Sequence, residues 1–183
     1  MQGFIVSRSK KNDIRIRKVD KTHKKVRVSG EKGSAHNKLR YELYTHAYNR
    51  LAEANEQAMY FEIIALCDML ITDRCEAYTQ YLLHNDEVEY PTESIGLSVA
   101  FMGTAVKDKA PNVYESDEYK ALYQQLLEFA KMRNEVLHGF ILVKNVANDV
   151  SLQERLDWAE HSAEFGNKLV RVWASWVDKQ IKI

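Results

Sequence analysis

The stretch KMRNEVLHGF, residues 131–140, places an arginine, an asparagine and a histidine where the last buried turns of a helix are expected. Asn134 and His138 are four residues apart, so a helix puts them on one face. Arg133 and His138 are five apart, which is about 140° around an ideal helix and roughly 7.5 Å along its axis. Arg133 is therefore not expected to sit beside His138 in a straight helix. Its long side chain can still converge on the same pocket, particularly if the helix loosens before Gly139.

These residue types are suited to chemistry on a phosphate group. Arginine keeps its charge and presents a planar fork of N–H groups that matches two phosphate oxygens. A histidine close to the negative end of a helix dipole is favoured in its protonated form, which suits a proton donor. Arginine–histidine pairs also occur as surface contacts or at capped helix ends, so a structural role for Arg133 and His138 is the alternative.

The composition predicts that helices position these residues. Of the 183 residues 45% are apolar, and only two are proline and seven glycine, which is too few turn residues for a typical β-sandwich or barrel. Apolar residues recur at helical spacing from about residue 38 to 83, with a break at residues 52–57. The positions expected to be buried there are Leu39, Leu43, Ala47, Leu51, Met59, Ile63, Leu66, Leu70, Tyr78 and Leu82.

The helix that carries the motif is expected to begin at Ser116, a good N-cap residue, and to end at Gly139. A short helix at residues 95–107 precedes it, a final helix spans about residues 152–180, and loops are expected at residues 84–94 and 109–118. The predicted fold class is all-α, a four- to five-helix up-and-down bundle. The last helix is expected to bury Leu156, Ala159, Phe165, Leu169, Val172, Trp173 and Trp176.

The beginning of the chain is strongly basic although the net charge is zero. Residues 1–40 hold 13 Lys and Arg against three acidic residues, so 13 − 3 = +10, and the remainder holds 13 against 23, so 13 − 23 = −10. Alternating apolar and basic residues at 12–30 predict a short β-hairpin, with a loosely ordered arm as the alternative. We expect a basic N-terminal extension and linker at residues 1–37 and the helical bundle at residues 38–183.

A basic extension of this kind can bind the phosphates of RNA, and it can equally lie on the acidic remainder of its own chain or of a neighbour. The residues expected to contact RNA phosphates are Arg15, Arg17, Lys18, Lys24, Lys25 and Arg27.

Other residue patterns predict neither a cofactor nor a metal site. Cys67 and Cys75 are the only cysteines and lack the spacing of zinc ligands, so we expect them to be buried as small apolar residues. The sequence has no stretch of about 18 apolar residues, so no membrane span is predicted. Its N-terminus lacks the pattern of a signal peptide, and together these features favour the cytoplasm. One of four acidic residues could pair with Arg133 or His138, although a solvated face is favoured for all of them: Glu62, Asp68, Asp73 and Glu76.

The segment Arg133-Asn134-Glu135-Val136-Leu137-His138 resembles the signature of the HEPN superfamily, in which four to six residues separate an arginine, followed by a polar residue, from a histidine. Its place late in a long helix, before a final helix, is similar to the layout of that family. The resemblance covers roughly residues 38–180 and leaves the basic extension outside it.

The resemblance implies a metal-independent endoribonuclease of the kind found in toxins and antiviral defence systems, in which two chains share one cleft. Carried over by position, Arg133 would hold the scissile phosphate and His138 would act as general acid or base while the RNA 2′-hydroxyl attacks. Asn134 would orient His138 or bind phosphate. The products would carry a 2′,3′-cyclic phosphate and a 5′-hydroxyl.

The resemblance also implies particular partners: RNA, a second copy of the chain, and a cognate antitoxin or other regulatory protein. Many members of the superfamily are inactive, so the resemblance in fold does not by itself imply the activity. The alternative is therefore a non-catalytic module that binds RNA or a partner protein.

Overall fold

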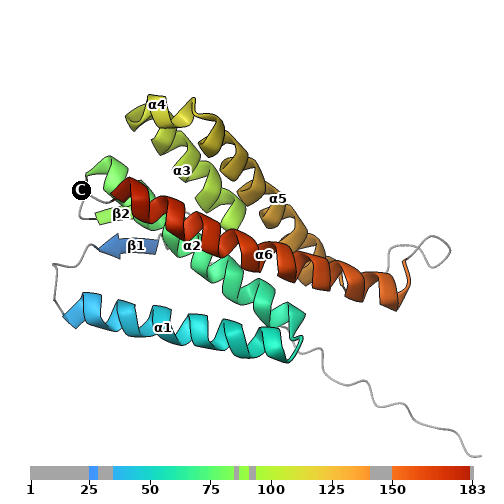
Figure 1. The fold of residues 1–183 in the computed structure, drawn as a ribbon. Helices are drawn as coiled ribbons and strands as arrows, with labels where there is room; N and C mark the ends of the chain where they lie inside the picture. Colours follow the sequence, from blue (N-terminus) through green and yellow to red (C-terminus); the bar gives the residue numbers. More distant parts are fainter. Residues whose placement is uncertain (1–24, 29–34, 85–86, 91–93, 141–149, 182–183) are drawn as a thin grey trace, which may run out of the picture.

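The computed structural model describes residues 25–28, 35–84, 87–90, 94–140 and 150–181, and nearly all of these are helical (Figure 1). The predicted helical class is therefore confirmed. The helices are α1 (Ala35–Glu56), α2 (Tyr60–Leu83), α3 (Ile95–Lys109), the single turn α4 (Pro111–Tyr114), α5 (Asp117–Gly139) and α6 (Leu152–Ile181), and the strands are β1 (Lys25–Val28) and β2 (Glu87–Tyr90).

Helix α2 is the centre of the molecule and packs against α1, α3, α5 and α6. Side chains on several sides of it are buried, as expected of a helix surrounded by others. The largest side chains buried in this core include Tyr78 of α2, Phe129 of α5 and Trp173 of α6. A substitution at a buried position of α2 therefore alters the packing of α2 against its neighbouring helices.

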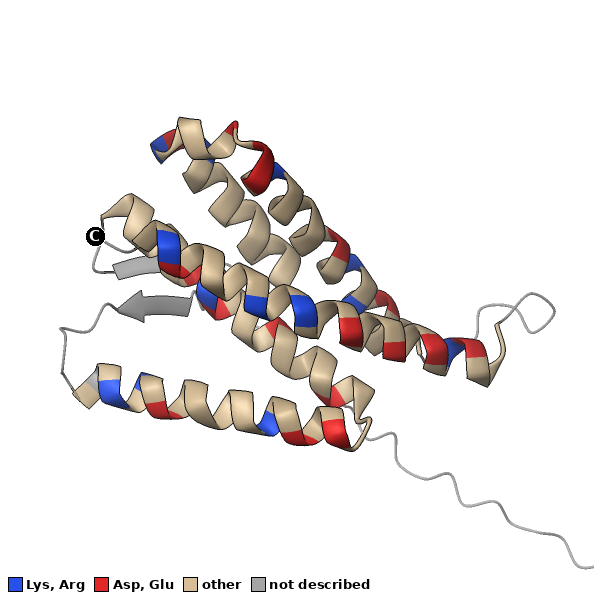
Figure 2. Ribbon diagram, viewed as in Figure 1, with Lys and Arg blue, Asp and Glu red and all other residues tan. Residues whose placement is uncertain are grey.

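The described helices carry charges of both signs (Figure 2). Acidic residues predominate on the N-terminal half of α6 and basic residues on its C-terminal half. Eight of the 13 Lys and Arg in residues 1–40 fall in residues 1–24, outside the described residues. The helical part of the chain is therefore the more acidic part.

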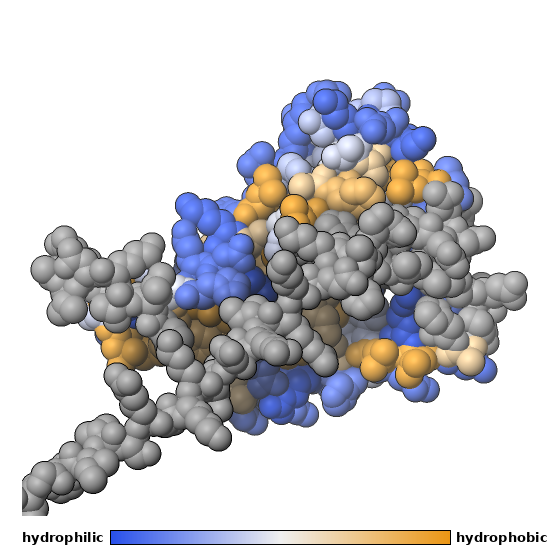
Figure 3. Space-filling model, turned by 180° about the vertical axis from the view of Figure 1, so that it is seen from behind, coloured by the Kyte–Doolittle hydropathy of each residue, from blue (hydrophilic) through white to orange (hydrophobic). Residues whose placement is uncertain are grey.

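Two leucines that the periodicity assigns to the core lie at the surface instead. Leu39 and Leu43 of α1 are 54% and 60% exposed, and apolar residues reach the surface in separate places on the face shown in Figure 3. Helix α1 is buried mainly through its second half, while its first half borders an open groove against Met69 of α2, which is itself 52% exposed. Val172 of α6 and Met59 at the α1–α2 junction, which are also expected to be buried, are 52% and 37% exposed.

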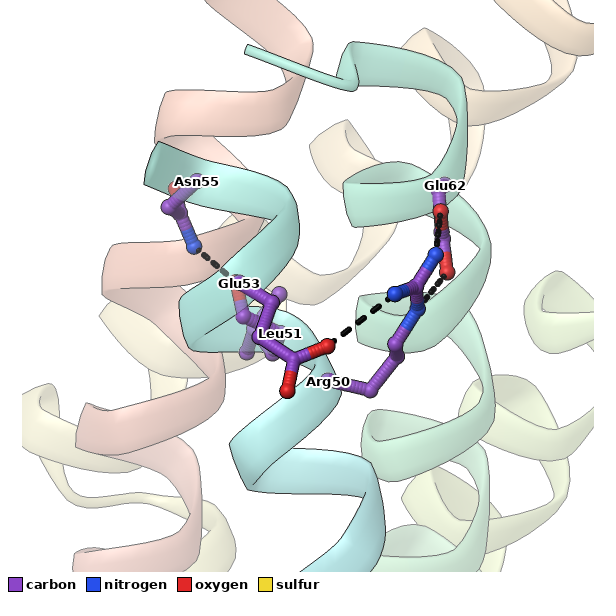
Figure 4. A network of polar contacts seen from close by, with 5 residues as sticks. All are labelled: Arg50, Leu51, Glu53, Asn55 and Glu62. Carbon is purple, nitrogen blue, oxygen red and sulfur yellow. Dashed lines mark hydrogen bonds and ion pairs between the residues drawn. The ribbon is translucent and has the colours of Figure 1, made fainter. Parts of the chain in front are cut away.

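The predicted break between the first two helices is confirmed, but it lies at residues 57–59, because residues 52–56, where the sequence predicts it, are the end of α1. Ala58 has a φ of 52°, in the left-handed region that stops a helix. Before the junction, the Asn55 side-chain nitrogen donates to the Leu51 carbonyl at 2.6 Å within the last turns of α1. Across the junction, the Arg50–Glu62 ion pair joins α1 to α2 through Nε–Oε1 (2.5 Å) and Nη2–Oε2 (3.0 Å) contacts (Figure 4).

The two strands pair antiparallel, with Lys25 opposite Tyr90 and Val28 opposite Glu87. Strand β2 lies in a segment that the sequence assigns to a loop, so that assignment is wrong there. Four residues carry too weak an alternation to predict a strand without knowledge of its partner. The first half of the predicted hairpin, which includes Ile14 and Ile16, lies outside the described residues, so the hairpin remains a prediction.

Helix α5 begins where the sequence predicts, with the Ser116 side chain accepting a hydrogen bond from the Tyr119 amide at 3.3 Å. The predicted loop before it contains the turn α4. Helix α5 packs tightly where α6 contributes Gly166: a Cβ atom there would lie 2.5 Å from the Phe129 ring and 3.2 Å from Cys67 Cβ. This close approach fixes α5 against α2 and α6, and so fixes the residues near its end.

Candidate active site

The motif lies in the last turns of α5, and the end of this helix is held differently from the prediction. Gly139 is still helical, and Phe140 follows it in a right-handed conformation, so Gly139 is not the C-cap. Arg155 of α6 instead donates through Nη1 to the carbonyls of Gly139 (2.6 Å) and Phe140 (2.7 Å). The Phe140 ring also packs edge-on against Phe61 of α2, with centroids 4.7 Å apart.

The three predicted catalytic residues come together at this end. Arg133 Nη1 lies 2.9 Å from Asn134 Oδ1 and 3.0 Å from His138 Nε2. Because arginine can only donate hydrogen bonds, Nε2 must be the acceptor, which places the proton of a neutral imidazole on Nδ1. Asn134 contacts Arg133, although its spacing places it on the face of His138.

A fourth residue, Asp68 of α2, completes the cluster. Its Oδ2 lies 2.8 Å from Arg133 Nε, and its Oδ1 accepts a hydrogen bond from Thr72 at 3.4 Å. The side chains of Asp68 and Arg133 are 18% and 20% exposed, so this ion pair is largely shielded from solvent. The expectation that Asp68 lies on a solvated face of its helix is therefore wrong.

The other acidic candidates on α2 are also engaged elsewhere. Glu62 pairs with Arg50, and Asp73 accepts a hydrogen bond from the Tyr44 hydroxyl. Glu76 is 1% exposed, within the core. Spacing along α2 could not distinguish Asp68 from these residues, since only the packing of α5 on α2 decides which carboxylate meets Arg133. Arg155 was missed for the same reason.

The cluster is built as an open polar site. His138 and Asn134 are exposed, and among the described residues Arg133 Nη2 has no hydrogen-bond partner. Because Asn134 and His138 use the two N–H groups of Nη1, the N–H groups of Nη2 are the ones left for an anion, on the same guanidinium that contacts the His138 imidazole. No three His, Cys, Asp or Glu side chains within the described ranges are grouped so that they could hold a metal ion.

The residues predicted to contact RNA are not brought to this cluster in the part of the chain that is described. Arg15, Arg17, Lys18 and Lys24 lie outside the described residues. Lys25 and Arg27 lie on β1, which pairs with the strand that follows the C-terminal end of α2. The motif end of α5 packs instead on the N-terminal end of α2, about 36 Å away for a helix of 24 residues.

The remaining candidate residues behave as core or surface groups. Cys67 and Cys75 are free and buried, as predicted, and burial raises the pKa of the Cys67 thiol to about 12. Trp173 and Trp176 stack in the core, while Trp158 is 54% exposed.

In comparisons with known proteins, no family model, no curated protein and no solved structure matches the chain. Within the described residues, none of the helices combines the length and the apolar character needed to cross a membrane.

Proposed function

We propose that the chain is a HEPN-like bundle and acts as a homodimeric, metal-independent endoribonuclease. The single observation that carries this proposal is the contact between Arg133 and His138, which unites a phosphate-binding group with a proton acceptor at an exposed site. The motif alone is short, so the proposal depends on the two side chains meeting in three dimensions.

In the proposed reaction Arg133 binds a non-bridging oxygen of the scissile phosphate and balances its growing negative charge. Once Arg133 Nη1 has turned from His138 to the phosphate, His138 Nε2 takes the proton of the RNA 2′-hydroxyl as that oxygen attacks phosphorus, and the bond from phosphorus to the 5′-oxygen breaks. The departing oxygen must receive a proton from a second acid. The His138 of a second copy would supply that proton if the two copies face one another across a shared cleft.

We propose that the protein is a toxin or a defence effector, with RNA as its substrate and a regulatory protein as a further partner. The alternative, a non-catalytic module that binds RNA or protein, is favoured by one observation: Arg133 is already engaged by Asp68 and Asn134 within its own chain. An arginine with these partners could serve only to join α5 to α2.

A cleavage assay separates the two functions. Total RNA or tRNA is incubated with the purified chain with and without EDTA, and the product ends are analysed. The ribonuclease proposal expects cleavage that EDTA does not reduce, with 2′,3′-cyclic phosphate and 5′-hydroxyl ends. RNA that is bound but stays intact over a range of protein concentrations supports the non-catalytic module.

A further inference from the structure

Asp68 contacts Arg133 at a particular nitrogen. Its Oδ2 binds Nε and neither of the two terminal nitrogens, while Thr72 donates to its other oxygen. A carboxylate that occupied both terminal nitrogens would block the edge that binds phosphate. The observed contact leaves both terminal nitrogens free of Asp68.

The remaining contacts of Arg133 fit this orientation. Nη1 is shared between Asn134 Oδ1 and His138 Nε2, and Nη2 has no partner within the described residues. An arginine side chain has several rotatable bonds, and an exposed one samples many rotamers. The shielded contact with Asp68 on the central helix α2 restricts that freedom.

We propose that Asp68 is the positioning residue of this site: it fixes the Arg133 guanidinium so that the plane of its N–H groups meets His138 and an incoming phosphate. The consequence for cleavage rests on the proposed function. The consequence for the geometry of Arg133 and His138 does not, and it can be tested without RNA.

The competing explanation is that the Asp68–Arg133 pair only joins two helices. The chain offers a matched control for that role, because Glu62 and Arg50 form a comparable ion pair through Nε between α1 and α2 (Figure 4). Glu62→Ala removes an interhelical carboxylate at a different place. A purely structural effect should therefore appear in both variants, and a positioning effect only at Asp68.

The first measurement is the nuclear magnetic resonance signal of the His138 ring in protein with isotope-labelled histidine. Asp68→Ala and Arg133→Ala are each expected to shift this signal, and the double variant is expected to shift it no further than Arg133→Ala does. Glu62→Ala is expected to leave it in place. Asp68→Asn, which keeps the shape of the side chain, gives the same comparison if Asp68→Ala does not fold.

The second measurement is cleavage. Asp68→Asn should lower kcat by about 10- to 100-fold through misplacement of Arg133, with little change in KM. The inference is overturned if Arg133→Ala moves the His138 signal while both Asp68 variants leave it unchanged, or if no variant moves it. A wild-type chain that does not cleave RNA refutes the proposed function, and the His138 signal then decides the positioning role alone.

Discussion

Arg133 reaches the imidazole of His138 at 3.0 Å although the two residues leave α5 about 140° apart. The helix stays regular through Gly139, so the long arginine side chain and not a distortion of the backbone makes the contact. Asp68 holds the guanidinium from the side of α2, and Arg155 holds the end of the helix. The site therefore draws on three helices, while its motif occupies one.

We predict that His138→Ala lowers RNA cleavage by about 100- to 10,000-fold, the usual contribution of a general acid or base. Arg133→Ala should abolish cleavage through loss of the phosphate ligand. Lys131→Ala is the control, because Lys131 is an exposed cation on the same helix. Cleavage rates and circular dichroism melts are compared. Cleavage at the wild-type rate by either site variant would refute the mechanism, and unfolding of both would favour a structural role.

The chain should sediment as a dimer near 43 kDa, roughly twice the 21.3 kDa of one chain. Negative charge develops on several phosphate oxygens during the reaction, and balancing this charge calls for more than one arginine and one histidine. Two-fold symmetry doubles the set, because the same patch faces itself across the axis. Sedimentation and the rate of cleavage are measured over the same concentration range. Full activity from a strict monomer at micromolar concentration contradicts this prediction.

Removal of residues 1–24 should weaken RNA binding and leave the cleavage position unchanged. These residues hold eight basic and two acidic side chains, so 8 − 2 = +6 is lost. The slope of log affinity against log salt should flatten by about 0.7 for each phosphate contact that disappears. Filter binding at several salt concentrations gives the slope.

The matched comparison is removal of residues 1–33, which also removes β1 and leaves β2 without its partner. This longer deletion should lower the melting temperature in addition to the RNA affinity. If the shorter deletion already lowers the melting temperature and the salt slope stays constant, the basic extension lies on the acidic helices and does not bind RNA.

Gly166→Ala should destabilise the fold by about 1–3 kcal/mol, the usual range for overpacking a core. The new methyl group would meet the buried Phe129 ring at 2.5 Å, and Cys67 leaves no room on its other side. Gly96→Ala is the control, because its nearest neighbour would be Ser94 Oγ at 3.8 Å. Thermal melts should show a fall of about 2–4 °C per kcal/mol for Gly166→Ala only. Equal melting temperatures for both variants would contradict the observed packing.

Cys67 and Cys75 should be unreactive toward a thiol reagent at pH 8 in the native protein and both reactive in guanidinium chloride. Burial raises the pKa of Cys67 from 9.0 to about 12 and raises that of Cys75 as well. The unfolded chain releases these protons at lower pH than the folded chain. Their contribution to stability is therefore complete below about pH 8.5 and declines as the pH rises toward 12. Rapid labelling of the native protein would contradict this prediction.

The sequence could predict those features that depend on neighbours along the chain. Helical periodicity located α1, α2, α5 and α6, and Ser116 marked the start of α5 because its hydroxyl caps the amide of Tyr119. The motif itself identified Arg133, Asn134 and His138 as a group, since all three lie within two turns.

Features that depend on distant segments could not be predicted. Asp68 is one of several carboxylates on α2, and its role follows from the packing of α5 against that helix. Gly139 has the residue type of a C-cap, yet it is the last residue of α5, and Arg155 from α6 satisfies the carbonyls at this end. Leu43 fits the apolar stripe of α1, but among the described residues no element covers the first half of that helix closely enough to bury its side chain.

The pairing of β1 with β2 has a consequence for the order in which the chain folds. It joins Val28 to Glu87 and so closes a loop that contains all of α1 and α2. The loss of chain entropy on closing a loop grows with its length, whereas α1 and α2 are linked by residues 57–59 alone. We expect the α1–α2 pair to form early and the strands to pair last. In pulsed hydrogen exchange during refolding, the amides of β1 should gain protection after those of α2.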